Sequence, residues 1–209
     1  ERLSKEALWP LENLRLLKVS AERDVAPESR DTARSLDPHG AGTTNLIRAF
    51  INSDNLPRDE VERDLLNDLN DVYRGDCEFT NIICQEDEGT ATWEIFLEEQ
   101  EKGDIRLSQS GSSLKSIFII LCTLRLLPLI NKFEWNKVIL AIEEPENNLH
   151  PSLLRRLLTF LSNQRDQKGF TLIITTHSPI CIDWSARNSS SQIIHMQHDG
   201  QEAKCYTAM

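Results

Sequence analysis

The stretch VILAIEEPENNLHP, at residues 138–151, decides the fold class of this 209-residue chain. It opens with a continuous apolar run at residues 138–142, and a second run, TLIIT, follows at residues 171–175. Continuous apolar runs are typical of parallel strands that are buried on both faces. Helical periodicity at residues 152–164 lies between them and completes a β-α-β unit. The sequence therefore predicts an α/β fold built on a parallel sheet.

The other elements are predicted from hydrophobic periodicity and turn residues. In chain order they are a strand at 14–21, a helix from Thr43 or Thr44 to 51, a helix over 61–73, a hairpin of strands 79–84 and 91–97 around the acidic turn 85–90, an apolar helix at 114–127 and a strand at 192–196. We expect two parts. Residues 1–104 form a variable α/β part with an acidic insert, and residues 105–209 carry the core sheet.

The net charge of −10 excludes a chain built as a whole to coat nucleic acid. Residues 54–104 hold 17 acidic and 4 basic side chains, so the negative excess lies there. We interpret this segment as a solvated acidic face; the alternative is a surface that repels DNA or docks a basic partner. DNA contact is then expected only indirectly.

Five scattered cysteines without C-x-x-C spacing argue against a disulfide framework and a zinc site, so we interpret them as reduced thiols. The longest apolar run, residues 117–124, ends at Arg125, well short of the ~18 residues that cross a bilayer. Residues 1–5 lack the shape of a signal peptide. We expect a cytoplasmic protein without membrane contact.

Charged and polar residues follow both buried strands at the edge where chemistry gathers in parallel sheets. Glu143 and Glu144 end the first strand with side chains on opposite sides, so one can face a metal-bound phosphate and the other the attacking water. The alternative is an ordinary polar strand end. His177 follows the second strand and either contacts a γ-phosphate or is structural.

Residues 107–113, LSQSGSS, precede the apolar helix at 114–127. Their hydroxyls and backbone N–H groups at a helix N-terminus predict an anion site, or alternatively only a serine-rich helix cap.

Together these segments resemble the C-terminal half of an ABC-type ATPase head, in the branch that contains the OLD-family and related bacterial defence ATPases. Residues 107–116 resemble the signature loop, 138–144 Walker B, 145–151 the D-loop region and 175–179 the switch-histidine segment. The resemblance covers about 105–183. It implies ATP and Mg²⁺ as cofactors, and two composite sites between two heads.

The resemblance also implies roles for single residues. Glu144 would be the general base, Glu143 would support Mg²⁺ indirectly where the family usually has Asp, and His177 would sense the γ-phosphate. The signature loop would contact the nucleotide of the partner head. Its register stays open: either Ser108 is the contacting serine, or the loop is read as Gly111-Ser112-Ser113, which keeps a Gly-Ser pair. The nucleotide-contacting residues would be Leu107, Ser108, Ser110, Gly111, Ser112 and Asn148.

The sequence contains no G-x-x-x-x-G-K-[ST] motif, and the nearest glycine loop, GAGTT at residues 40–44, has no lysine. We expect the P-loop lobe to lie outside this chain, which alone would be inactive; the rival interpretation is a degenerate head. Two functions follow: an ATPase whose dimer gates an effector such as a nuclease in anti-phage defence, or a non-hydrolysing dimerisation scaffold or nucleotide sensor. An SMC-like DNA repair head is least expected, because no heptads flank the motifs.

Overall fold

A computed structural model describes residues 13–31, 35–198, 200 and 202–207. Its centre is a parallel sheet in the order β1-β6-β7. The strands are β1 (Arg15–Val19), β6 (Val138–Glu143) and β7 (Thr171–Thr175), and α5 (Pro151–Lys168) connects the last two. The predicted β-α-β unit and the predicted strand at 14–21 are confirmed. β6 and β7 are neighbours, so their carboxyl ends meet at one edge.

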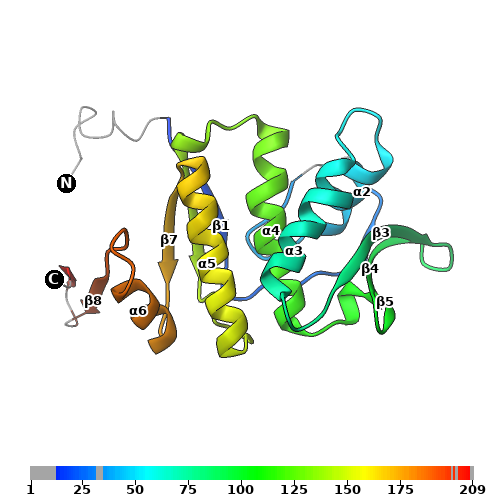
Figure 1. Cartoon of the computed structure of the whole chain (residues 1–209). Coiled ribbons are helices and arrows are strands. Elements are labelled where there is room, and N and C mark those ends of the chain that lie inside the picture. Colours follow the sequence, from blue (N-terminus) through cyan, green and yellow to red (C-terminus); the bar gives the residue numbers. More distant parts are fainter. Residues whose placement is uncertain (1–12, 32–34, 199, 201, 208–209) are drawn as a thin grey trace.

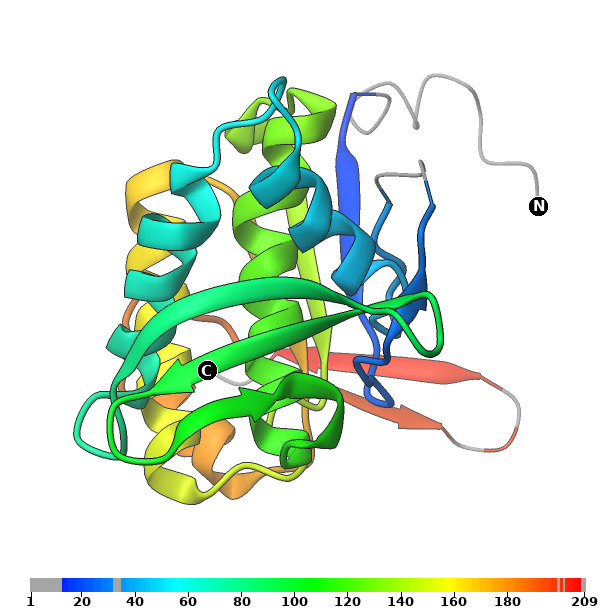
Figure 2. The ribbon, with the colours of Figure 1, turned by 90° about the vertical axis from the view of Figure 1, so that its right-hand side faces the viewer.

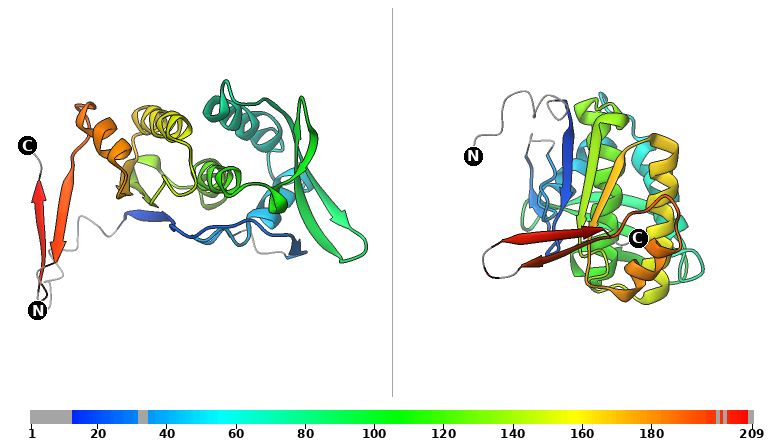
Figure 3. Two further views of the ribbon diagram at one scale, coloured as in Figure 1. Left: turned by 90° about the horizontal axis from the view of Figure 1, so that it is seen from below. Right: turned by 90° about the vertical axis from the view of Figure 1, so that its left-hand side faces the viewer.

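Helices cover one face of this sheet and leave the other open (Figures 1 and 3). The long helix α4 (Ser112–Asn131) packs against β1, and α5 packs against β7. On the opposite face Leu16 is 65% exposed and Ile173 is 47% exposed. The expected burial on both faces is therefore wrong for this sheet, because nothing in the described part of the chain covers that side.

A second, antiparallel sheet lies beyond the helices, as Figure 2 shows. Its strands are β2 (Glu28–Ser29), β3 (Phe79–Asp87), β4 (Thr92–Glu99) and β5 (Gly103–Arg106). The predicted hairpin is confirmed, but its turn is shorter than expected because β3 continues to Asp87. Helix α2 (Thr43–Asn52) contacts this sheet and α4, within one continuous apolar core. The division at residue 104 stays a prediction.

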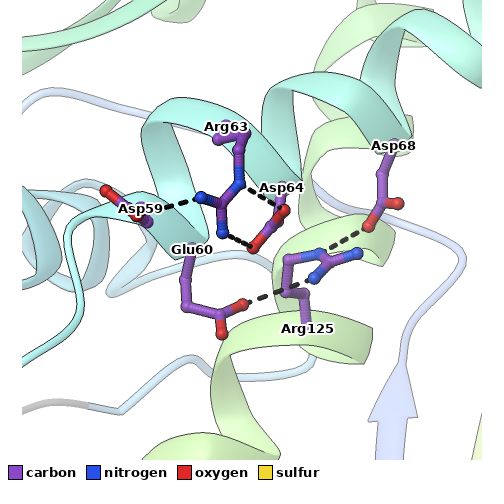
Figure 4. Close-up of polar contacts among 6 residues, drawn as sticks. All are labelled: Asp59, Glu60, Arg63, Asp64, Asp68 and Arg125. Atoms are coloured by element: carbon purple, nitrogen blue, oxygen red, sulfur yellow. Dashed lines mark hydrogen bonds and ion pairs between the residues drawn. The ribbon is translucent and has the colours of Figure 1, made fainter.

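The predicted helix at 61–73 is a π-helical turn, η2 (Glu60–Leu65), that continues as α3 (Leu66–Tyr73). Figure 4 shows how Arg125 of α4 holds this junction. Its Nε lies 2.6 Å from Asp68 Oδ2 and its Nη1 lies 3.3 Å from Glu60 Oε2. These ion pairs, and that of Arg156 with Asp76, show that part of the acidic segment serves internal structure.

The remaining elements are short and peripheral. They are η3 (Leu107–Gln109), η4 (Trp135–Lys137), α6 (Pro179–Ala186), β8 (Ile194–His198) and β9 (Ala203–Thr207). β8 overlaps the predicted strand at 192–196, and the β8–β9 ribbon extends away from the body (Figure 3). All five cysteines are free thiols. Helix α4 is long and apolar enough to cross a membrane, but most of it is buried inside the protein as a core helix.

Candidate active site at the strand ends

Glu143 is the last residue of β6, and its side chain lies on the open face of the sheet. Its Oε1 lies 2.8 Å from Lys18 Nζ of β1, and its Oε2 accepts a hydrogen bond from Ala21 N at 3.3 Å. The hydrogen bond from Lys18 lowers the pKa of Glu143 below its ordinary value, and the Ala21 amide acts in the same direction. The Glu143 carboxylate is therefore negatively charged and forms an ion pair with the Lys18 ammonium group.

Glu144 follows in a left-handed backbone conformation, with φ of +42°. A non-glycine residue in this region is strained by about 1 kcal/mol, so neighbouring contacts must hold it there. The Glu144 amide donates to Thr175 O of β7 at 2.8 Å. Its carboxylate accepts a hydrogen bond from Asn147 Nδ2 at 3.0 Å. The kink turns Glu144 out of the strand direction and places its carboxylate at the sheet edge.

A third contact with this kink comes from the loop after β1, which sequence reasoning missed. The Arg23 guanidinium donates to Ser20 O at 2.7 Å, Glu143 O at 2.9 Å and Glu144 O at 3.3 Å. Burial lowers the pKa of Arg23, while the nearby carboxylates of Glu146 and Glu144 act in the opposite direction. One side chain thus binds two consecutive carbonyl groups of the β6 tip.

Glu146 joins the tip of β6 to the segment that carries His177. Its Oε1 accepts hydrogen bonds from Thr176 Oγ1 at 2.6 Å, His177 N at 2.9 Å and Ser178 N at 3.0 Å. Burial alone would raise the pKa of Glu146, but the bond from Thr176 and the backbone amides outweigh it and lower the pKa. The imidazole of His177 is exposed at the same edge as the carboxylates. Sequence reasoning placed Glu146 only in the D-loop region, although an acid just after a buried strand was a usable signal.

The expected signature loop forms η3 and the start of α4. Leu107 is buried, and Ser108 Oγ donates to Oε2 of the buried Glu94 at 2.5 Å. Ser110 Oγ donates to Leu107 O at 2.8 Å. Gly111 is the exposed N-cap of α4, and Ser112 is the exposed first residue of the helix. Lys115 Nζ, one turn further, lies 2.7 Å from Asp24 Oδ1, so the loop after β1 also contacts α4.

The glycine loop at residues 40–44 already holds an anion from its own chain. Glu28 accepts hydrogen bonds from Gly42 N at 2.5 Å and from Asn45 N at 2.8 Å. A surface hollow of about 490 Å³ beside this loop is lined by Asp31 and Asp37 as well as Glu28. Because carboxylates fill and surround the N-terminus of α2, this loop does not fit a nucleotide phosphate.

The residues at the strand ends match the ligand type that a Mg²⁺ site needs. Glu143 and Glu144 present carboxylate oxygens, the ligand type that Mg²⁺ prefers. Asn148 is exposed beside them, with φ of +62°. The structure thus gathers Glu143, Glu144, His177 and Asn148 around the ends of β6 and β7. The residues of the expected signature loop lie apart from them, at the start of α4.

Comparisons with known proteins identify relatives of this chain. The DNA repair protein RAD50 of Dictyostelium discoideum is 29% identical over 149 residues, which are 69% of this chain and 11% of RAD50. This chain therefore spans only a small part of that relative. This relative belongs to the class of DNA repair heads, which the sequence made the least expected, and membership of the OLD-type branch stays a prediction.

Solved structures show the same fold. A structure from work on ATP-driven dimerization and DNA stimulated activation of SMC ATPases aligns with a TM-score of 0.55 at 10% identity, over 79% of this chain and 89% of that one. The Smc head domain of Pyrococcus furiosus, bound to the C-terminal domain of ScpA, aligns at 0.52 with 11% identity, over 72% of this chain and 35% of that one. The fold is thus that of an ABC-type P-loop ATPase head.

A family model covers the chain from residue 4 to residue 183, across the sheet edge, the loop before α4 and the His177 segment. The chain belongs to this family, described as "AAA domain, putative AbiEii toxin, Type IV TA system".

Proposed function

We propose that this chain is the C-terminal lobe of an ABC-type ATPase head that hydrolyses ATP between two heads. The observation that carries the proposal is the edge formed by β6 and β7. There the kinked Glu144 and the exposed His177 are held on adjacent strand ends by hydrogen bonds to Thr175 and Glu146. Mg²⁺-ATP, when bound, supplies the phosphoryl group for transfer to water.

In this proposal the Glu144 carboxylate accepts the proton of the attacking water, and Glu143 supports Mg²⁺ indirectly. His177 donates toward the γ-phosphate. The start of α4, with Gly111 and Ser112, faces the nucleotide of the second head. A helix N-terminus is suited to that task because its free N–H groups attract phosphate.

A P-loop lobe is proposed to pack on the open face of the β1-β6-β7 sheet. Leu16 and Ile173 expose aliphatic surface there, and Ile139 lies between their strands in the same sheet. Exposed aliphatic side chains on an uncovered sheet face support an interaction site there. The glycine loop at 40–44 does not supply a phosphate cradle, because the Glu28 carboxylate already accepts hydrogen bonds from Gly42 N and from Asn45 N just beyond the loop.

Beyond turnover, we propose that the head is cytoplasmic and gates an effector such as a nuclease in bacterial anti-phage defence. The support is the resemblance of residues 143–151 and 176–179 to that branch. Phage plating on cells that carry wild-type protein or Glu144→Gln tests this part separately, and equal plating efficiency would contradict it.

The test of turnover uses the full-length protein that carries this chain. Glu144→Gln should retain ATP binding, lower kcat by about 100-fold or more, and trap an ATP-bound dimer that sedimentation detects. Glu134→Gln is the matched control, because Glu134 is an exposed carboxylate paired with Lys137 away from the strand ends. Unchanged turnover in Glu144→Gln would contradict the proposal and favour a non-hydrolysing scaffold.

A second test uses calorimetric titration of the isolated chain with Mg²⁺-ATP. We expect no micromolar binding, because the sequence has no G-x-x-x-x-G-K-[ST] loop to hold the β- and γ-phosphates and Glu28 already binds the glycine loop at 40–44. Micromolar affinity would contradict the proposed separate P-loop lobe.

A further inference from the structure

We propose that Arg23 is a positioning residue for Glu144, an inference that rests on the proposed ATPase function. Arg23 lies in the loop after β1, about 120 residues away along the chain from the carbonyl groups that it binds. In this proposal Arg23 does not contact the nucleotide. Its role is to fix the backbone from which the Glu144 carboxylate projects.

Arg23 contacts the β6 tip with a forked geometry. Arg23 Nη1 donates to Glu143 O at 2.9 Å and Nη2 donates to Glu144 O at 3.3 Å, so the two terminal nitrogens of one planar group bind consecutive carbonyls. A guanidinium can do this because its donors are fixed in a fork. Lysine carries all its donors on one nitrogen, so it cannot place a separate nitrogen against each carbonyl.

The backbone that Arg23 holds is strained. Glu144 has φ of +42°, a conformation that L-residues keep only when the surroundings impose it. On its N–H side, Glu144 is held by Thr175 O of β7. On its carbonyl side, the contacts are the Asn147 amide at 3.1 Å and Arg23. Without Arg23, one of these two restraints on the carbonyl is lost.

Arg23 is itself held in place by its own loop. Arg23 Nη1 also donates to Ser20 O at 2.7 Å, and Ser20 N donates to Pro38 O at 2.8 Å. Ala21 N binds the Glu143 carboxylate, and Asn147 Nδ2 donates to Ala21 O at 3.5 Å. The loop and the β6 tip are thus joined by contacts in both directions. The buried Arg23 Nε has no hydrogen-bond partner in the described structure. The hydrogen bonds of this guanidinium group are therefore made by Nη1 and Nη2.

The experiment measures ATP turnover and nucleotide affinity for Arg23→Gln, Glu144→Gln and their double variant in the full-length protein. We expect Arg23→Gln to lower kcat by about 30-fold and to leave ATP affinity within about two-fold, because a misplaced base affects the chemical step alone. In the Glu144→Gln background, Arg23→Gln should have no further effect on kcat. Arg74→Gln is the matched control, since Arg74 forms an exposed ion pair with Asp71 far from the strand ends.

Several results would overturn the inference. Unchanged kcat in Arg23→Gln, or a fall in ATP affinity that matches the fall in kcat, would each exclude a positioning role. Arg23→Lys keeps the positive charge but replaces the two terminal nitrogens by a single one, so it should fold and show an intermediate kcat. Loss of folding in both variants would assign Arg23 to stability alone. Turnover that survives Glu144→Gln would instead overturn the proposed function, and with it the reaction that Arg23 is inferred to serve.

Discussion

Removal of the Glu146 carboxylate should detach the His177 segment from the tip of β6. In the wild-type protein one carboxylate oxygen accepts three hydrogen bonds, at 2.6, 2.9 and 3.0 Å, from a hydroxyl and two backbone amides. Glu146→Ala deletes the shared acceptor and leaves all three donors without it. Glu146→Gln keeps one acceptor oxygen but loses the charge.

The expected magnitude follows from the hydrogen bonds. A hydrogen bond to a charged group contributes about 1.5–3 kcal/mol, and the lower end applies because Glu146 is only half-buried and the three bonds share one atom. We therefore expect Glu146→Ala to lower the free energy of unfolding by about 3 kcal/mol, and Glu146→Gln by about 1–2 kcal/mol.

The assay is urea unfolding of wild type, Glu146→Gln and the control Glu134→Gln as a function of pH. The pKa of Glu146 is lowered by folding, so its contribution is complete above its ordinary value of 4.5 and is lost as the pH falls through the folded value. The stability difference between wild type and Glu146→Gln should therefore shrink below pH 4.5. A difference under about 0.5 kcal/mol at neutral pH, or one that persists in acid, would refute this account.

Three further predictions test other parts of the structure. Arg125→Leu should lower the free energy of unfolding by about 2–3 kcal/mol in urea titrations, because the buried Asp68 carboxylate then lacks its ion-pair partner; a change under about 0.5 kcal/mol would contradict this. Gly42→Ala should lower it by about 3 kcal/mol in the same assay, because the new Cβ would lie 1.9 Å from Ser35 O at φ of +91°, and a neutral effect would contradict that geometry. Mixed dimers of Gly111→Glu and Glu144→Gln heads should regain about half of the wild-type turnover if the two sites act independently; heterodimers without activity would show coupled sites or a loop that acts within its own head.

The sequence predicted the parallel core well because its signals are local. Two apolar runs define β6 and β7 almost to the residue, and the helical pattern between them defines α5, which continues four residues past its predicted end to Lys168. Helix α2 begins at Thr43 as predicted, but the residue at its N-cap is Gly42 and neither threonine caps it. The placement of Glu143, Glu144 and His177 at one edge then follows from strand order alone. Sequence periodicity could not show that one face of this sheet is open, because the apolar runs of β6 and β7 read the same whether or not a partner covers them.

The contacts that hold the candidate site were harder to predict because they join distant segments. Arg23 and Glu143 are 120 residues apart, and Glu94 and Ser108 belong to different elements. In the sequence, a charged side chain after a strand cannot be distinguished from an ordinary loop residue. Only the fold shows which carbonyl group it binds. The π-helical turn of η2 was equally hidden, since its apolar positions also fit an α-helix.

The geometry also bears on the register of the loop before α4, which the sequence left open. Ser108 donates to the buried carboxylate of Glu94, so a phosphate that approached its hydroxyl would meet a nearby negative charge. Gly111, by contrast, is exposed, and a Cβ there would meet only Ser113 Oγ at 3.8 Å. Backbone approach is therefore open at Gly111 and Ser112, where the N–H groups of α4 begin. We infer that this pair faces the nucleotide of the second head, while Ser108 and Leu107 anchor the loop to its own sheet.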